Sequence, residues 1–339
     1  SAAFDKLSVP YPRTELGAPS FTKGFLADQT HELPKLVVEA RTLNKIQGTF
    51  ISSILKHVGP DGRIHGNINQ IRDGQGGTVS GRISMSNPNL QQIPARDPEL
   101  GPLIRILVHY ASVFGKSRDL PLRGVEEFVD GYRNDPDMDF HTMVAEMAGI
   151  NRKQAKTINL GMMYGMGVNK LSEQLDIPLD DAKDLIAQYH ERVPFVKMLM
   201  RGVTDRLNDK ASGGAIRSLK GRKCRFDLWE PDTFKMTKAM PYQEAVLEYG
   251  ATARLKRAYT YKALNRLIQA SAADMTKQAM VNVYETGKVP LIQIHDELAV
   301  SVKNKEEAEG IAAIMQTAVP IEVPSVCDIE IGASWGTAA

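Results

Sequence analysis

The sequence is poor in cysteine and has no long hydrophobic run. Cys224 and Cys327 are the only cysteines among 339 residues, and their spacing matches no metal-ligand pattern. This excludes a disulfide framework and a zinc site and favours a reducing, intracellular compartment. No apolar run reaches the roughly 18 residues of a membrane span, so no membrane partner is predicted. The start, Ser1-Ala2-Ala3, is typical of neither a signal peptide nor an ordinary open reading frame and indicates a processed or truncated chain.

Charge of one sign is not in excess either. The chain carries 42 basic and 40 acidic residues, a formal net charge of +2, and 42% of its residues are hydrophobic. Any contact with nucleic acid must therefore come from local clusters of charge, because overall basicity is absent. The length and hydrophobic content fit a globular protein with one large domain or two to three ordinary ones.

The stretch most informative about function covers residues 151–167, NRKQAKTINLGMMYGMG. Arg152, Lys156, Leu160 and Tyr164 recur at every fourth residue, a spacing that places them on one face of a helix. Two cations one turn apart suit the oxygens of a triphosphate, and the two apolar side chains beyond them offer a surface to a base. An ordinary amphipathic helix with a solvated basic face has the same pattern.

Three further segments carry polar patterns. Residues 76–96, GGTVSGRISMSNPNLQQIPAR, combine Arg82 with several amides and suit minor-groove edges and sugar-phosphate oxygens, although an ordinary surface loop has the same composition. Residues 213–225, GGAIRSLKGRKCR, predict a basic hairpin tip. Residues 253–266, ARLKRAYTYKALNR, interleave basic side chains with Tyr259 and Tyr261, which suits either a phosphate track with stacking positions or a solvated helix face.

The remaining periodicities predict helices and a hairpin. We expect helices over residues 33–56, 125–132, 171–193, 194–210 and 264–287, a beta element near residues 59–68, and an edge strand within residues 323–335. Apolar alternation on both sides of His295-Asp296 predicts two strands joined by a tight turn. An aspartate at such a tip has a hard divalent cation as its natural partner, with a simple polar turn as the alternative.

Three motifs together, GRISMSNPNLQQIP, the Arg-Lys-Leu-Tyr-Gly helix and IQIHDELAV, resemble the family A DNA polymerases in the family's order and over nearly the whole chain. The resemblance implies an α+β right-hand fold with an antiparallel palm sheet, helical fingers and a partial helical thumb. It divides the chain into a lead-in and thumb-side helix (1–58), a first palm part (59–150, with an apparent gap near 105), fingers (151–257) and a second palm part (258–339).

The same resemblance implies template-directed addition of deoxynucleotides to a primer 3′ end by two-metal phosphoryl transfer. The implied partners are primer-template DNA and deoxynucleoside triphosphates, with two Mg²⁺ ions per active site, in the cytoplasm of a bacterial or phage-infected cell. The implied catalytic residues are Asp296 as metal ligand, Lys156, Arg152, Tyr164 and Glu297. Nucleotide binding is implied for Arg152, Lys156, Leu160, Tyr164 and His141. DNA binding is implied for Arg82, Asn89, Gln91, Gln269, His295 and Gly165.

Two departures from the family pattern matter. Leu160 stands where the family usually has Phe or Tyr, which alters the surface that faces the sugar. After the polar loop the family continues into a strand whose aspartate is the first metal ligand, whereas this chain has PLIRILVHYA. Three explanations are open: residues absent from the sequence but present in the polypeptide, an engineered deletion, or a natural loss. The first is favoured because a palm sheet without that strand would lose ladder partners and packing.

Two other functions fit parts of the pattern. A catalytically inactive module that binds primer-template DNA but lacks the first metal aspartate would keep Arg82, Asn89, Gln269 and the basic clusters. A single-subunit RNA polymerase has a similar Arg-Lys-Tyr-Gly helix, but GRISMSNPNLQQIP and the glutamate after His-Asp argue against it.

Overall fold

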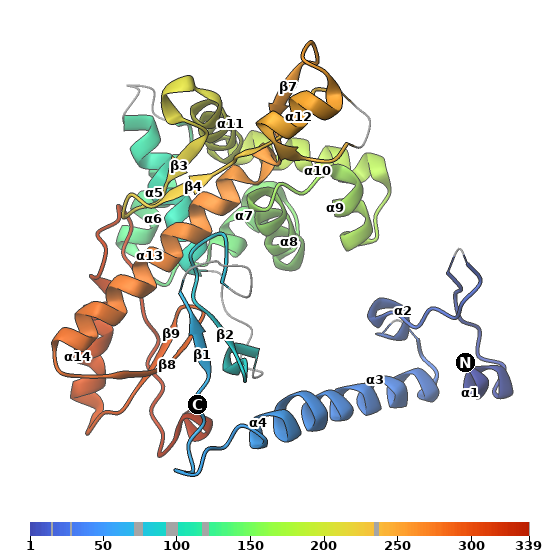
Figure 1. Ribbon diagram of the computed structural model, residues 1–339, viewed down its shortest axis with the longest axis vertical. Helices are drawn as coiled ribbons and strands as arrows, with labels where there is room; N and C mark the ends of the chain where they lie inside the picture. The colour runs from blue at the N-terminus through green and yellow to red at the C-terminus, as the bar shows by residue number, and fades with distance from the viewer. Residues whose placement is uncertain are drawn as a thin grey trace. The chain divides into compact units, whose positions relative to one another are not determined.

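The computed structural model describes residues 1–14, 16–27, 29–70, 77–92, 101–116, 122–233 and 237–338 (Figure 1). It divides into two compact units, one made of Ser1–Ile68 and Met85–Pro94 and the other of Asn69–Ser84 and Ala95–Ala339. Residues 76 and 93–96 of the predicted polar loop lie outside the described residues. In the described ranges, no helix is long and apolar enough to cross a membrane.

The first unit is mainly helical. Its helices are α1 (Ala2–Lys6), α2 (Lys23–Ala27), α3 (Glu32–Lys45), the π-helical segment η1 (Ile46–Ser52), α4 (Ser53–Leu55) and the 3₁₀ segment η2 (Leu90–Gln92). The helix predicted over residues 33–56 is confirmed, with a π-helical segment that contains Gly48 and Thr49, two weak helix formers. Phe4, Val9 and Leu26 form a small core near its start.

The second unit contains most of the helices. They are α5 (Gly101–Lys116), α6 (Val125–Asn134), α7 (Phe140–Ala148), α8 (Arg152–Met163), α9 (Val168–Leu175), α10 (Leu179–Arg192), α11 (Pro194–Asn208), α12 (Tyr242–Tyr249), α13 (Ala263–Glu285) and α14 (Lys305–Gln316). Short 3₁₀ segments are η3 (Lys210–Ser212), η4 (Thr260–Lys262) and η5 (Trp335–Thr337). The helices predicted over residues 125–132, 194–210 and 264–287 are confirmed, whereas the segment 171–193 forms two helices, α9 and α10, that are separated before Pro178.

The strands are short and pair in separate sheets. They are β1 (Asn67–Asn69), β2 (Ser84–Ser86), β3 (Ala215–Arg217), β4 (Lys223–Arg225), β5 (Leu228–Pro231), β6 (Met240–Pro241), β7 (Leu255–Arg257), β8 (Pro290–Ile294) and β9 (Glu297–Val300). The sheets are β1-β2, β3-β4, β6-β5-β7 and β8-β9. Short sheets among many helices agree with the α+β class, and β8 and β9 form an antiparallel pair within the segment predicted as the second palm part.

Helix α13 runs through the second unit and contacts α5, α11, α14 and the strands β3, β4 and β8 (Figure 1). Its small side chains allow this close packing, since Ala270, Ser271, Ala272 and Ala273 are all buried. The largest buried side chains of the surrounding core include Phe128, Tyr132, Tyr189 and Phe195. Of the predicted site residues, this helix carries Gln269.

The edge strand predicted within residues 323–335 is wrong. Residues 318–332 form neither helix nor strand, although apolar alternation continues through part of them. Pro320 and Pro324 lack the backbone N–H that a ladder needs, which explains why alternation alone is not enough here.

The junction at Arg105 lies inside one continuous helix. Helix α5 includes the residues on both sides of this junction, and Ile106, Leu107 and Val108 are buried in the main core. Arg105 is buried as well. Its Nη1 donates to the Pro324 carbonyl oxygen at 2.6 Å, and its guanidinium lies 4.6 Å from the ring centre of Tyr132.

Candidate functional site

Helix α8 carries the predicted triphosphate-binding face and begins with a reciprocal cap. The Asn151 side chain accepts from the Gln154 backbone N–H at 2.9 Å, and the Gln154 side chain accepts from the Asn151 backbone N–H at 3.1 Å. These two bonds satisfy backbone groups that the first helical turn leaves unpaired. The helix start is therefore fixed one residue before Arg152.

The four residues spaced at every fourth position lie on the outer side of α8. Arg152 and Tyr164 are exposed, whereas Lys156 and Leu160 are half-buried. The opposite side faces the core through Ala155, Ile158 and Met162. The predicted common face is confirmed, and Leu160 packs partly against the core at its edge.

Asp139 connects the start of α7 to the start of α8. Its carboxylate accepts from the His141 backbone N–H at 2.9 Å, from Thr142 Oγ1 at 2.7 Å and from Arg152 Nε at 2.5 Å. Burial alone would raise the pKa of Asp139, but the hydrogen bonds from Thr142, Arg152 and the His141 backbone outweigh it and lower the pKa to about 2. An ionised Asp139 therefore holds the Arg152 side chain.

His141 is placed inside the protein. It is 8% exposed, and its Nδ1 lies 2.9 Å from the side-chain nitrogen of Asn159 in α8. Burial lowers the pKa of His141, the positive charges of Arg152 and Lys156 lower it further, and Asp139 opposes them. His141 thus joins α7 to α8, and its predicted contact with the nucleotide stays a prediction.

The end of α8 packs closely on η4. Gly165 has φ +71°, and a Cβ on it would lie 2.9 Å from the Tyr261 carbonyl oxygen, so a larger residue is disfavoured there. Tyr164 is 40% exposed and Tyr261 is 55% exposed. The Lys262 ammonium lies 5.4 Å from the Tyr261 ring centre, within reach of a cation–π interaction. Gly165, the residue after Tyr164, therefore contacts the predicted basic-aromatic cluster at this point.

Several basic side chains of the two predicted clusters contact other groups within the protein. Residues 215–225 form the predicted hairpin, with Ile216 opposite Cys224. Within it, Arg222 pairs with Asp274 of α13. In the second cluster, the Arg257 guanidinium lies over the Trp229 ring at 4.5 Å, and Arg266 lies over Phe226 at 4.1 Å. This second segment consists of β7, η4 and the start of α13, so it is not a single helix face.

The polar loop residues belong to different units. Arg82 lies in the second unit, where its carbonyl oxygen accepts from Thr78 Oγ1 at 2.9 Å. Asn89 and Gln91 lie in the first unit, where Asn89 Oδ1 accepts from the Gln91 backbone N–H at 3.1 Å. Gln269, the remaining amide of the predicted DNA contacts, is half-buried on α13.

Asp296 lies in the two-residue turn of the β8–β9 hairpin, as predicted. Ile294 pairs with Glu297, which leaves His295 and Asp296 as the turn, and His295 adopts φ +54°. Both turn side chains are exposed. Glu297 Oε1 accepts from the Trp335 indole N–H at 2.9 Å, so this carboxylate is engaged by the C-terminal segment.

The environment of Asp296 includes Cys327. Burial raises the pKa of the Cys327 thiol, and the negative charges of Asp328 and Asp296 raise it further. Within the described ranges, no three or more His, Cys, Asp or Glu side chains gather as a metal site. Asp296 fits as one ligand of a divalent cation, but the described residues do not complete a site for two.

Sequence reasoning missed the most buried acid in this region. Asp274 is 5% exposed, and its partners, the Arg222 side chain and the Lys220 backbone N–H, are distant in the sequence. One feature of the sequence could have indicated this contact: Asp274 directly follows a stretch of small residues that was expected to pack closely. A charged group on a buried helix face requires a partner.

Comparisons with known proteins place this chain in one family. Residues 2–112 and 122–337 match the model of DNA polymerase family A. The chain is 34% identical to a DNA-directed DNA polymerase of Pseudomonas phage M6, over 98% of this chain and 56% of the phage protein. It is 30% identical to a thermostable DNA polymerase I of Thermus thermophilus, over 98% of this chain and 40% of that protein.

The solved structures agree. The POL domain of Pol1 from M. smegmatis, solved in complex with DNA primer-template and dNTP, matches 99% of this chain and 59% of that chain, with a TM-score of 0.71 and 26% identity. The phage match extends over 400 positions, more than the 339 residues of this chain, so the phage protein has internal segments without a counterpart here. The chain spans about half the length of that relative (56%). On these matches, the chain belongs to DNA polymerase family A.

Proposed function

We propose that this chain is a template-directed DNA polymerase that adds deoxynucleotides to a primer 3′ end. The observation that carries the proposal is the outer face of α8, where Arg152, Lys156, Leu160 and Tyr164 lie in line on a capped and well-packed helix. Family membership and the named activities of the relatives support the same reaction. From the phage and bacterial relatives, we propose that the protein acts in the cytoplasm of a bacterial or phage-infected cell.

Arg152 and Lys156 would bind the triphosphate and neutralise the charge that develops during phosphoryl transfer. Arg152 is already oriented by Asp139, and such pre-orientation reduces the ordering that binding requires. Leu160 would contact the sugar and base with less stacking than an aromatic ring. Tyr164 would lie beside the nascent base pair, where Gly165 leaves room for the template. Closing of α8 over a correct pair would couple selection to chemistry.

Arg82, Asn89, Gln91, Gln269 and His295 would contact primer-template DNA. Asp296 would supply one carboxylate ligand for Mg²⁺, the cation proposed for this chain, of which the family resemblance predicts two per active site. Glu297 is the weaker candidate because Trp335 already occupies one of its oxygens. Lys156 would also protonate the leaving pyrophosphate, a role that its position on the proposed triphosphate-binding face supports.

A second function is favoured by one specific observation. The described residues provide no cluster of metal-binding acids around Asp296, and the sequence has PLIRILVHYA where the family's strand with the first metal aspartate is expected. A module that binds primer-template DNA without catalysis would have these properties. Peptide mapping with a protease that does not cut after arginine tests the junction, since a peptide that contains Ile104-Arg105-Ile106 establishes a covalent continuation and favours the binding module.

Template-directed primer extension with Mg²⁺ and deoxynucleotides, run beside an Asp296→Ala variant, tests the proposal. Extension by the unaltered protein that the variant loses, while both bind primer-template DNA equally, is the expected result. Tight binding without extension by the unaltered protein would refute the polymerase and leave the binding module.

A further inference from the structure

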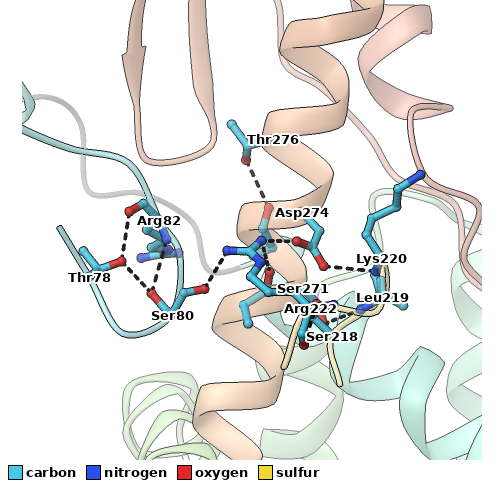
Figure 2. Close-up of polar contacts among 12 residues, drawn as sticks. Thr78, Ser80, Arg82, Ser218, Leu219, Lys220, Arg222, Ser271, Asp274 and Thr276 are labelled. Carbon is cyan, nitrogen blue, oxygen red and sulfur yellow. Dashed lines mark hydrogen bonds and ion pairs between the residues drawn. The ribbon is translucent and has the colours of Figure 1, made fainter. Parts of the chain in front are cut away.

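The buried carboxylate of Asp274 is the centre of a polar network outside the residues discussed for the reaction. A buried carboxylate is unfavourable unless partners replace its lost hydration. Figure 2 shows two such partners on the β3–β4 hairpin: Arg222 forms an ion pair with Oδ1, and the Lys220 backbone N–H donates to Oδ2 at 3.0 Å. Asp274 therefore fixes the tip of this hairpin against α13.

The Arg222 guanidinium extends the network to the loop at residues 77–84. Its Nη1 donates to the Ser80 carbonyl oxygen at 3.2 Å, and its Nη2 also lies 3.4 Å from the Ala270 carbonyl oxygen (Figure 2). Ser80 is 6% exposed, so this contact lies away from solvent. One side chain thus joins three segments that are distant in the sequence: the loop, the hairpin and α13.

The loop is in turn ordered around the backbone of Arg82. Ser80 Oγ lies 3.2 Å from Thr78 Oγ1, which donates to the Arg82 carbonyl oxygen at 2.9 Å. The Arg82 backbone N–H donates to Ser80 Oγ at 3.5 Å (Figure 2). Both backbone polar groups of Arg82 are held by loop hydroxyls, and the loop itself is held by Arg222. These bonds fix the backbone from which the Arg82 side chain extends.

Gly81 marks the closest approach between the loop and Arg222. It has φ +78°, and an added Cβ would overlap the Arg222 guanidinium. Gly221, in the β3–β4 hairpin, has a closely similar φ of +79°, but an added Cβ there meets open space. The two glycines share one backbone requirement and differ in the contact with Arg222.

We propose that Asp274 and Arg222 are positioning residues for primer-template binding. Their ion pair holds the loop at residues 77–84 in the conformation that directs Arg82 toward DNA. The inference rests on the proposed function, since it concerns how that site binds its substrate. It also gives Arg222 an internal role in place of the phosphate contact that a basic hairpin tip suggests.

Three variants of the intact chain test this role: Gly81→Ala, Gly221→Ala and Arg82→Ala. Gly81→Ala pushes Arg222 from the loop without changing any charge, and Gly221→Ala is the matched control for backbone strain. The readout is primer-template affinity by fluorescence anisotropy at fixed salt. We expect Gly81→Ala to weaken binding by about tenfold, a loss of the size that one arginine contact gives. Gly221→Ala should stay within about twofold, because it leaves the network intact.

A double-mutant cycle separates positioning from a general loss of stability. If the position of Arg82 depends on the Asp274–Arg222 ion pair, adding Arg82→Ala to Gly81→Ala causes little further loss of affinity. If the two substitutions act independently, their losses of affinity multiply. Asp274→Asn keeps an acceptor for Lys220 but loses the charge that holds Arg222, so it should reproduce the Gly81→Ala loss and speed amide exchange at residues 77–84. Thermal unfolding of each variant checks that it folds.

The outcomes separate the two proposals. Unchanged binding by Gly81→Ala, or multiplying losses in the cycle, would overturn the positioning role while the proposed function stands. Absence of primer-template binding by the unaltered chain would overturn the proposed function and the positioning role with it.

Discussion

Arg152 Nε lies 2.5 Å from Asp139 Oδ2, so the first cation of the triphosphate-binding face is joined to the residue that caps the preceding helix. The contact links a predicted ligand group in α8 to the start of α7. Because the pair is partly exposed, a triphosphate can share or replace the carboxylate without a large loss of stability.

Substitution of Asp139 should separate its cap from its ion pair. Asp139→Asn keeps a good N-cap acceptor and should lower the free energy of unfolding by less than about 1 kcal/mol. Asp139→Ala removes the cap as well and should cost about 1 kcal/mol more. Denaturant unfolding at neutral pH measures both values. Equal losses in the two variants would contradict the capping role.

The same carboxylate should contribute to acid sensitivity. Its pKa in the folded protein is lowered to about 2 from the ordinary value of 3.8, so the ionised form favours the folded state. The sign follows: the contribution is full above about pH 4 and is lost as the pH falls toward 2. The difference in thermal stability between the unaltered protein and Asp139→Asn should therefore shrink across this window. A difference at pH 2 as large as that above pH 4 would count against the assignment.

The α8 face offers a matched pair of kinetic tests. Lys156→Ala should lower kcat/KM for deoxynucleotides by about 10- to 100-fold, the size expected for a lost bond to a charged group. Lys153→Ala removes a cation from the same helix, but off this face and at an exposed position, and should have little effect. Steady-state primer extension measures both. Equal losses would show that only general positive charge matters.

Stability should also fall in mild acid because of His141. Burial lowers the pKa of His141 below its ordinary 6.5, so the unfolded chain takes up the proton more readily. The contribution of neutral His141 is therefore complete above about pH 6.5 and decreases as the pH falls below it. His141→Gln should show a smaller change in Tm between about pH 7.5 and 5.5 than the unaltered protein. His57→Gln, at an exposed position, is the control, and an equal change in both would refute the assignment.

Local patterns in the sequence predicted the local parts of the site. The four-residue spacing placed Arg152 and Tyr164 on one face of α8 because helical periodicity is a property of neighbouring residues. The apolar alternation around Asp296 likewise predicted the β8–β9 turn. The alternation of apolar residues near Cys327 led to a wrong prediction of an edge strand. Two prolines, and the absence of a paired neighbour among the described residues, disfavour a strand there.

Contacts between distant residues were not predictable in this way. Arg222 and Asp274 are 52 positions apart, and Arg222 and Ser80 are 142 apart, so no periodicity relates them. The junction at Arg105 shows a similar limit. The family resemblance indicated a missing strand, whereas packing of Ile106 and Val108 in the core makes a helix of the residues that are present.

Single-nucleotide incorporation opposite each of the four template bases tests the central claim most directly. The unaltered chain is given one deoxynucleotide at a time with Mg²⁺ on an annealed primer-template. The proposed polymerase predicts incorporation of the complementary nucleotide in each case and none by Asp296→Ala, even though the variant still binds the DNA. Tight primer-template binding by the unaltered chain with no incorporation of any nucleotide would contradict the claim and identify a binding module.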